Sequence, residues 1–144
     1  MNKANMTAKQ VIPALTYTDA KAAINFLCSA FGFKEHLVVP GEGNVIPHAE
    51  LKLGTIMIMV GSSSKEGEYS KFAKSPQELG DAVTQSPYIV VDDPDAFYAN
   101  AKAHGARIVI ELKDEDHGGR GFTCADLEGH LWNFGSYDPW AEKV

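Results

Sequence analysis

The pattern of hydrophobic and polar positions predicts two helices with similar boundaries. Asp19 is the predicted N-cap of the first helix, and Gly32 ends it. A second helix is predicted between Asp92 or Asp93 and Gly105. In the first helix, apolar side chains recur at three- and four-residue spacing and form one stripe, made of Ala23, Phe26, Leu27, Ala30 and Phe31.

Short runs rich in β-branched and aromatic residues predict the strands. One such run precedes each helix. Three more follow the first helix, at residues 35–40, 46–53 and 55–60, and three follow the second, at 107–112, 121–127 and 130–137. Each half of the chain therefore has the order strand, helix, strand, strand, strand.

The two halves form an internal repeat, because their landmarks keep nearly constant spacing. Asp19 and Asp92 are 73 positions apart, as are Gly32 and Gly105, and Gly54 and Gly129 are 75 apart. The predicted fold class is α+β, with two tandem βαβββ modules whose curved mixed sheets form a cup with the helices outside. The predicted divisions are a flexible N-terminal tail (1–9) and a single domain (10–144), made of module 1 (about 10–62), a linker (about 63–84) and module 2 (about 85–140). The polar linker is either a plain connection or a mobile flap over a site.

Composition and charge exclude several classes of protein. The 144 residues are 44% hydrophobic and 22% charged, as expected for one globular domain. A net charge of −6 argues against a nucleic-acid partner. The longest apolar run, 55–60, is too short to cross a membrane, and the N-terminus lacks the apolar core of a signal peptide. The two cysteines have no zinc-type spacing, so we expect a reduced, cytoplasmic protein.

Three stretches carry a resemblance to a known family: IPALTYTDAKAAINFLCSAFGF, PHAELKLGTIMIMV and GGRGFTCADLEGHLWNFGSYDPW. With the second helix they cover about residues 10–140, and they resemble the vicinal-oxygen-chelate superfamily of glyoxalases, bleomycin-resistance proteins and extradiol dioxygenases. The resemblance implies a ligand cavity inside the cup and a homodimer. It leaves open whether each cup is built within one chain or from modules swapped between two.

The resemblance also allows the residues of this sequence to be compared with the metal ligands of the family. Members similar to glyoxalase hold a divalent ion with four His or Glu ligands, one from the first and one from the last strand of each module. At the corresponding positions this sequence has Ile12, Ile58, Ser86 and Asn133. Two aliphatic residues, a hydroxyl and an amide cannot hold a catalytic divalent ion. We therefore expect no metal and no cofactor, and a protein nearer the metal-free bleomycin-resistance-like members.

The predicted binding site follows from Asn133 facing the cup. A tight turn at Glu128–Gly129 would pair Asn133 with Cys124 and place Phe122 on the same face. The resulting pocket is mostly apolar with a few polar groups, which is typical of small-molecule sites. The full set of predicted ligand-binding residues is Asn133, Phe122, Cys124, Tyr88, Ser86, Arg120, Ile58, Ile12, Tyr137 and Trp140.

Several of these residues have a structural alternative. Arg120 either orients a ligand or forms a surface ion pair with an acidic residue at 114–116. Tyr137 and Trp140 either stack on a planar ligand or pin the C-terminus to the core. Cys124 is expected to pack in the interior, because no base is predicted beside it.

His48 and Glu50 are the catalytic candidates, since residues two apart on a strand share a face. A two-residue turn at Leu53–Gly54 would place both on the side away from Ile58, whereas a bulge would reverse this. They are a solvated pair, a ligand-contacting or proton-transfer pair, or a relocated metal site. His130 follows the turn glycine and is expected to be an exposed turn residue.

The predicted function is that of a metal-free small-molecule-binding protein resembling bleomycin-resistance proteins, which sequester drugs. The ligand is expected to be apolar or planar, and the acidic charge suits a cationic one. The alternative is a glyoxalase-like lyase or isomerase, or a dioxygenase, with a non-standard or relocated active site. A diverged member that binds an ordinary metabolite is a third possibility.

Overall fold

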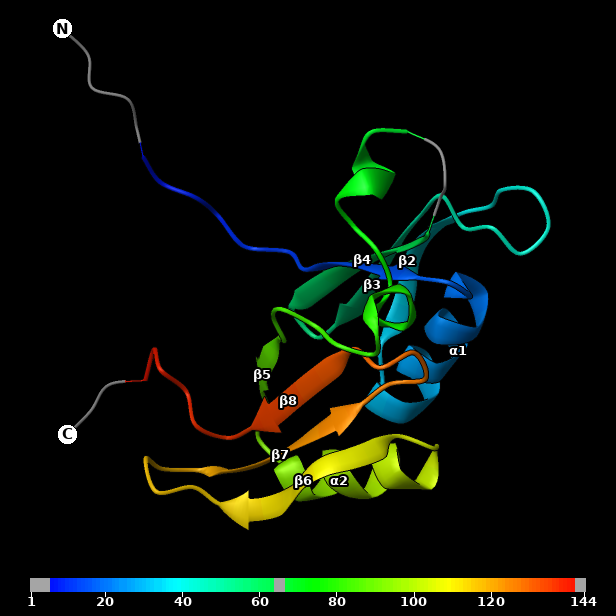
Figure 1. The fold of residues 1–144 in the computed structure, drawn as a ribbon. Helices are drawn as coiled ribbons and strands as arrows, with labels where there is room; N and C mark the ends of the chain where they lie inside the picture. Colours follow the sequence, from blue (N-terminus) through cyan, green and yellow to red (C-terminus); the bar gives the residue numbers. More distant parts are fainter. Residues whose placement is uncertain (1–5, 64–66, 142–144) are drawn as a thin grey trace, which may run out of the picture.

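The computed structural model describes residues 6–63 and 67–141, and within these the chain forms two βαβββ modules (Figure 1). Residues 1–5 of the predicted N-terminal tail lie outside the described residues. The predicted α+β class with tandem modules is confirmed. Module 1 contains β1 (Ala14–Tyr17), α1 (Ala20–Phe31), β2 (Lys34–Val39), β3 (His48–Leu53) and β4 (Ile56–Ser62). Module 2 contains β5 (Tyr88–Val90), α2 (Pro94–Ala103), β6 (Arg107–Asp114), β7 (Arg120–Ala125) and β8 (Leu131–Gly135).

Each module folds into a mixed sheet in which the first strand pairs parallel with the last. The strand orders are β1-β4-β3-β2 and β5-β8-β7-β6. The Met59 amide donates to the Pro13 carbonyl (2.9 Å), and the Asn133 amide donates to the Pro87 carbonyl (3.0 Å). These matching bonds show that the strand residues of the two modules correspond at a spacing of 74 positions.

Both helices begin at an aspartate, as predicted. Asp19 Oδ1 accepts from the backbone amide of Ala22 (3.0 Å), and Asp93 Oδ1 accepts from that of Ala96 (3.1 Å). Asp93, rather than Asp92, is therefore the second N-cap. Gly32 ends α1 with a φ of 82°, a left-handed conformation that costs little for a residue without a Cβ.

The helices cover one face of the sheets, and their contacts cross between the modules. Phe31 of α1 packs against Trp132 and Phe134 of β8, with ring centroids 5.4 and 4.9 Å away. Phe97 of α2 stacks on Phe134 at 5.3 Å. Figure 1 shows α1 beside both sheets, with the N- and C-terminal segments extending on the other side of the molecule. The core therefore lies between the two α-helices and the sheets, and the opposite sheet faces, which carry neither α1 nor α2, are called the helix-free faces.

The turn between β7 and β8 joins the two modules through buried polar groups. Tyr17 Oη donates to Asp126 Oδ2 (2.5 Å), and Trp132 Nε1 donates to the same oxygen (3.0 Å). Asp126 Oδ1 accepts from the backbone amides of Glu128 and His130, at 3.1 Å each. A buried carboxylate is tolerated when its oxygens are satisfied in this way.

Two further residues of this turn bind β1 and the segment that leads into α1. The Glu128 carboxylate accepts from the backbone amides of Thr18 (2.6 Å) and Asp19 (2.7 Å). His130 Nε2 donates to the Thr16 carbonyl (2.8 Å). The prediction that His130 is an exposed turn residue is therefore wrong, because the turn folds back onto module 1 and half-buries the ring.

The linker between the modules contains two short 3-10 helices, η1 (Tyr69–Lys71) and η2 (Pro76–Leu79). Ser75 is fully buried, and its Oγ lies 3.0 Å from Thr18 Oγ1. The second part of the linker is therefore anchored to module 1. Whether the linker acts as a flap stays a prediction, and residues 64–66 lie outside the described part. In the described ranges, no helix has the length and apolar character needed to cross a membrane.

Candidate functional site

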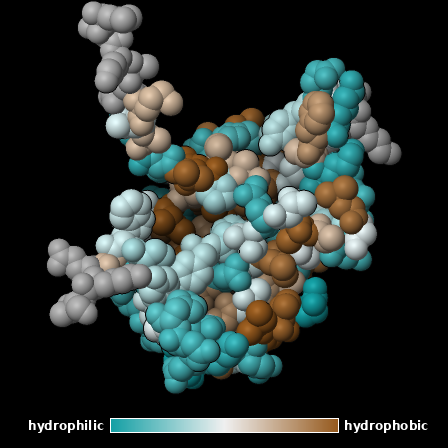
Figure 2. Space-filling model, turned by 60° about the vertical axis from the view of Figure 1, so that its left-hand side comes forward, coloured by the Kyte–Doolittle hydropathy of each residue, from teal (hydrophilic) through white to brown (hydrophobic). Residues whose placement is uncertain are grey.

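The helix-free face of each module carries a cavity. The module 2 cavity, of about 290 Å³, is bordered by strands β5 to β8 and by the segment after β8. Figure 2 views the molecule from the side on which the terminal segments extend and shows hydrophobic surface between hydrophilic regions. The wall of the module 2 cavity includes Tyr88, Ile110, His117, Thr123, Asn133 and Tyr137.

Asn133 lines the module 2 cavity, and both its oxygen and its nitrogen are hydrogen-bonded. Its Oδ1 accepts from Thr123 Oγ1 (2.6 Å), while its Nδ2 donates to Ser86 Oγ (2.9 Å) and to the Pro87 carbonyl (3.0 Å). These bonds join β5, β7 and β8 on one face. The amide is thereby held in one orientation, as a preorganised polar group in the wall requires.

Three aromatic side chains, those of Tyr88, His117 and Tyr137, line this cavity. Tyr88 crosses over Gly135, where an added Cβ would lie only 2.5 Å from Tyr88 Oη. The same hydroxyl donates to the Tyr137 carbonyl (2.7 Å). The Tyr137 ring meets that of His117 edge to face, with centroids 4.8 Å apart. Burial raises the pKa of Tyr88, so its hydroxyl remains a neutral donor.

The predicted positions of Phe122 and Cys124 in the cup wall are wrong by one residue of register. Thr123 pairs with Asn133, so Phe122 and Cys124 point to the helix-covered core. Phe122 borders the cavity but is only 3% exposed, and burial raises the pKa of the Cys124 thiol to about 12. The reason is the turn, which spans residues 126–130 instead of two residues. Cys124 packs in the interior, as its structural alternative predicted.

The predicted cup position of Ile58 is also wrong by one residue. Ile58 is 2% exposed and pairs with Leu51 in the core. Met59 corresponds to Asn133, because each donates its backbone amide to the proline that precedes the first strand of its module. Met59 therefore takes the place assigned to Ile58 on the helix-free face.

The metal site of glyoxalase-like members does not fit these residues. The corresponding side chains are those of Ile12, Met59, Ser86 and Asn133, which offer an alkyl group, a thioether, a hydroxyl and an amide. Catalytic divalent ions in proteins are held mainly by imidazole, carboxylate or thiolate groups. Across residues 6–63 and 67–141, no three His, Cys, Asp or Glu side chains are grouped so as to hold a metal ion.

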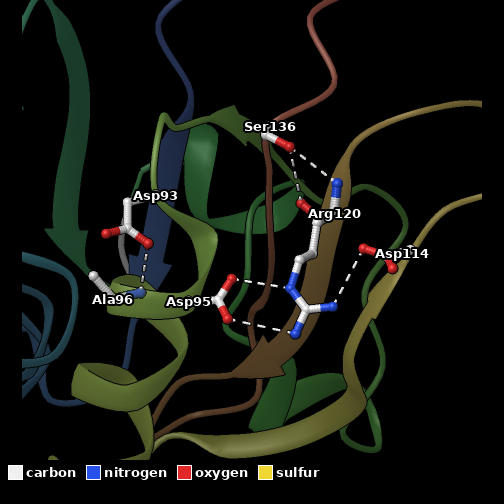
Figure 3. Close-up of polar contacts among 6 residues, drawn as sticks. All are labelled: Asp93, Asp95, Ala96, Asp114, Arg120 and Ser136. Atoms are coloured by element: carbon white, nitrogen blue, oxygen red, sulfur yellow. Dashed lines mark hydrogen bonds and ion pairs between the residues drawn. The ribbon is translucent and has the colours of Figure 1, made fainter.

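Arg120 forms an ion pair with Asp114, as its structural alternative predicted, and a second with Asp95, which the sequence did not predict (Figure 3). Its Nε and Nη2 donate to the two carboxylate oxygens of Asp95 (2.9 and 3.4 Å), and its Nη1 donates to Asp114 (3.3 Å). These bonds raise the pKa of Arg120. Although Arg120 borders the cavity, its guanidinium joins α2 to β6.

The two aromatic residues of the C-terminal segment behave differently. Tyr137 borders the module 2 cavity. Trp140 is 96% exposed, so the prediction that it pins the C-terminus to the core is wrong. The chain leaves the sheet after β8, which ends at Gly135.

His48 and Glu50 lie on the helix-free face of module 1. The hairpin turn consists of Gly54 and Thr55, between the paired Leu53 and Ile56. Both candidates therefore point away from Ile58, as a two-residue turn implied, and this side proves to be the helix-free one. His48 Nε2 lies 2.8 Å from Glu50 Oε2.

A third residue, which the sequence did not single out, joins this pair. His36 Nε2 lies 3.9 Å from Glu50 Oε1. The register of β2 against β3 shifts between Glu35 and Leu37, so His36 sits at an irregularity that a sequence pattern does not reveal.

The module 1 cavity lies beside His48. It has a volume of about 380 Å³ and is bordered by β1, β4, the start of β3 and the linker. Its wall includes Ala14, Thr16, His48, Met59, Ser62 and Tyr69.

Several known proteins and solved structures are similar to this chain over most of its length. An uncharacterized protein of Mycobacterium bovis is 32% identical over 123 residues, which are 85% of this chain and 80% of that protein. The crystal structure of TioX from Micromonospora sp. ML1 superimposes with a TM-score of 0.67 at 31% identity, covering 89% of this chain and 98% of TioX. FosX, a fosfomycin resistance protein from Listeria monocytogenes, shares the fold at 15% identity (TM-score 0.64, covering 93% and 94%).

The match to a family is equally extensive. The sequence model of the Glyoxalase/Bleomycin resistance protein/Dioxygenase superfamily matches residues 9–134, which include both modules almost completely. The two βαβββ modules have the architecture that the resemblance implied. The chain belongs to the Glyoxalase/Bleomycin resistance protein/Dioxygenase superfamily.

Proposed function

We propose that this protein binds an apolar or planar small molecule in the module 2 cavity without a metal ion. The observation that carries the proposal is the amide of Asn133. It occupies a position where glyoxalase-like members present a metal ligand, and it is bonded to Thr123 and Ser86 on the same face. A side chain held by neutral partners suits the orientation of a ligand, and it offers no charge for a divalent ion.

The wall of the cavity supports a planar ligand. The rings of Tyr88, His117 and Tyr137 line it, and Ile110 contributes an apolar side chain from β6. Apolar and aromatic walls with a few fixed polar groups are the usual composition of small-molecule sites. Aromatic faces also attract cations, and the net charge of −6 raises the local concentration of cationic ligands.

The first experiment asks whether a metal is present and used. Protein purified without chelators is analysed for its elements and assayed with the glutathione–methylglyoxal hemithioacetal. We expect less than stoichiometric metal and no turnover. A stoichiometric divalent metal together with turnover would contradict the metal-free proposal.

The second experiment measures binding with proflavine, a planar cationic acridine, as the probe. We expect its fluorescence to titrate to one site per chain and its presence to raise the melting temperature. Tyr88→Ala is expected to weaken binding about tenfold or more, since a stacked aromatic ring contributes about 1–3 kcal/mol. The matched control is Phe72→Ala, which removes an exposed aromatic ring of the linker that lines neither cavity. Equal weakening by both variants would place the probe elsewhere.

A third variant, Asn133→Glu, tests whether a carboxylate at one of the four family positions is enough to bind a metal ion. It introduces a carboxylate at the Asn133 position, but Ile12, Met59 and Ser86 still provide no charged donor. We expect the variant to bind no divalent metal. Stoichiometric metal uptake by this single variant would show that the remaining positions fit an ion after all.

The homodimer expected from the family resemblance is part of the proposal as well. Sedimentation equilibrium of the full chain at micromolar concentrations tests the homodimer directly. A monomeric mass at every concentration would contradict this part of the proposal.

A further inference from the structure

We infer that module 1 carries a general-base site, in which His48 removes a proton from a small planar ligand in the module 1 cavity. Glu50 holds the His48 imidazole in the tautomer that this step requires. The site lies on a different module from the Asn133 cavity and does not rest on the binding function proposed above.

The tautomer follows from the short contact between the two side chains. His48 Nε2 lies 2.8 Å from Glu50 Oε2, and an ionised carboxylate only accepts hydrogen bonds. The proton of a neutral His48 therefore sits on Nε2, and Nδ1 keeps its lone pair. Among the described residues, no hydrogen-bond partner of Nδ1 is found. A carboxylate, an imidazole and a free ring nitrogen in this order are the arrangement of an oriented general base.

His48 and Glu50 differ in exposure and in position relative to the module 1 cavity, which indicates different roles. The side chain of His48 is 40% exposed and lines the module 1 cavity, whereas that of Glu50 is 24% exposed and stands outside the cavity wall. On its far side, Glu50 Oε1 lies 3.9 Å from His36 Nε2. Glu50 is thus a positioning residue behind the base, and His36 borders it on the side away from His48.

The surroundings of His48 indicate which ligand the site takes. Ala14 and Met59 give the cavity an apolar wall, Thr16 and Ser62 add hydroxyl groups, and Tyr69 of the linker borders it. Such a wall suits a small, planar, largely apolar molecule with an acidic C–H or N–H group. Water is a weaker competitor for the base beside such a ligand, because the apolar body displaces it.

The probe for this chemistry is 5-nitrobenzisoxazole, a planar molecule that opens when a base removes its C3 proton. His48 Nδ1 takes that proton, the C–H electron pair forms the nitrile, the N–O bond breaks, and the phenolate oxygen leaves with the charge. The imidazolium then returns the proton to solvent. No oxidant, reductant or second substrate is needed, and the coloured phenolate reports the rate.

We expect the wild-type chain to open the probe with saturation and faster than the same concentration of free imidazole. His48→Gln is expected to lower kcat/KM by a factor of about a hundred or more, the range for loss of a general base. The matched control is His104→Gln, which removes an exposed histidine at the end of α2 and should keep the wild-type rate. Thermal melts of both variants establish that they are folded.

Glu50→Gln tests the positioning role with two readouts. We expect kcat to fall on the order of tenfold with little change in KM, because Glu50 acts through His48 and does not line the cavity. In ¹⁵N NMR spectra, the His48 ring should show the Nε2–H tautomer in the wild type and a mixture of tautomers in Glu50→Gln. A purely structural role of Glu50 would leave the tautomer unchanged.

Three outcomes would overturn the inference. They are a wild-type rate no higher than that of imidazole, a His48→Gln rate equal to the wild-type rate, and a His48 ring protonated on Nδ1 in the wild type.

Discussion

The hydroxyl group of Tyr17, at the end of β1, donates a 2.5 Å hydrogen bond to the carboxylate of Asp126, in the turn before β8. The two residues are 109 positions apart and belong to different modules. Asp126 also accepts from Trp132 Nε1, so one buried carboxylate joins β1, the β7–β8 turn and β8. The relative placement of the two sheets therefore depends on a polar group as well as on the aromatic core.

Tyr17→Phe is expected to destabilise the fold by about 1–3 kcal/mol, because it removes one donor from a buried charge. Urea unfolding followed by Trp132 fluorescence measures the change. The ring and its contact with His130 remain, so packing loss is small. The matched control is Tyr98→Phe, whose hydroxyl donates to Glu111 at the surface and which should change the stability by less than about 0.5 kcal/mol. Similar losses in both variants would argue against a special role for Asp126.

The stability is expected to fall as the pH rises above about 9. Burial raises the pKa of Tyr17 and raises that of Cys124 to about 12, whereas an unfolded cysteine ionises near 9.0. The contribution of Cys124 is complete below pH 9 and is lost as the pH rises from 9 toward 12, and that of Tyr17 declines above pH 10, the ordinary value for tyrosine, because the unfolded chain releases these protons first. Urea midpoints at pH 8, 9.5 and 10.5 measure the decline. Cys124→Ala should give a shallower decline, and an identical slope would contradict the assignment.

Gly135→Ala is expected to disturb the module 2 cavity. The new methyl group would lie 2.5 Å from Tyr88 Oη, so the ring must move and lose its bond to the Tyr137 carbonyl. We expect a loss of about 1–3 kcal/mol of stability from overpacking and at least tenfold weaker proflavine binding. The corresponding glycine of module 1 provides the control: a Cβ on Gly61 meets its nearest atom, the Pro47 carbonyl oxygen, at 3.3 Å. Gly61→Ala should leave proflavine binding within about twofold of wild type, given that it changes the other module.

Arg120→Met is expected to leave proflavine affinity within about twofold of wild type, because the guanidinium faces Asp95 and Asp114 instead of the cavity. Fluorescence titration at 50 and 300 mM salt measures the affinity. A tenfold loss at both salt concentrations would return Arg120 to the role of a ligand-orienting charge.

The boundaries of the helices were predictable because they depend on local signals. Asp19, Asp93, Gly32 and Gly105 bound the helices through capping and left-handed backbone, which act within a few residues. The sequence also showed which residue types occupy the four positions where glyoxalase-like members hold a metal. If any of these positions is shifted by one residue, the new residue is still not His, Asp, Glu or Cys. Asn133 borders the module 2 cavity, whereas Ile58 lies in the core, and the ligand-binding role of Asn133 stays a prediction.

The faces of the strands were harder to predict, because a single residue of register exchanges core and cavity. The β7–β8 connection spans residues 126–130, and the Asp126 carboxylate that shapes it is itself held by Tyr17. No pattern near residue 126 contains that partner. Phe122 and Cys124 were consequently assigned to the wrong face.

The sequence by itself thus determined the family, the two modules and the residue types that stand where a metal would be bound. Only the tertiary structure decided which side chains share a cavity. It brought His36 to Glu50 through an irregular strand pairing, and it turned His130 toward Thr16. The physical reason is that helix caps and turns are set by neighbours along the chain, whereas strand register and side-chain partners are set by contacts between residues up to about a hundred positions apart.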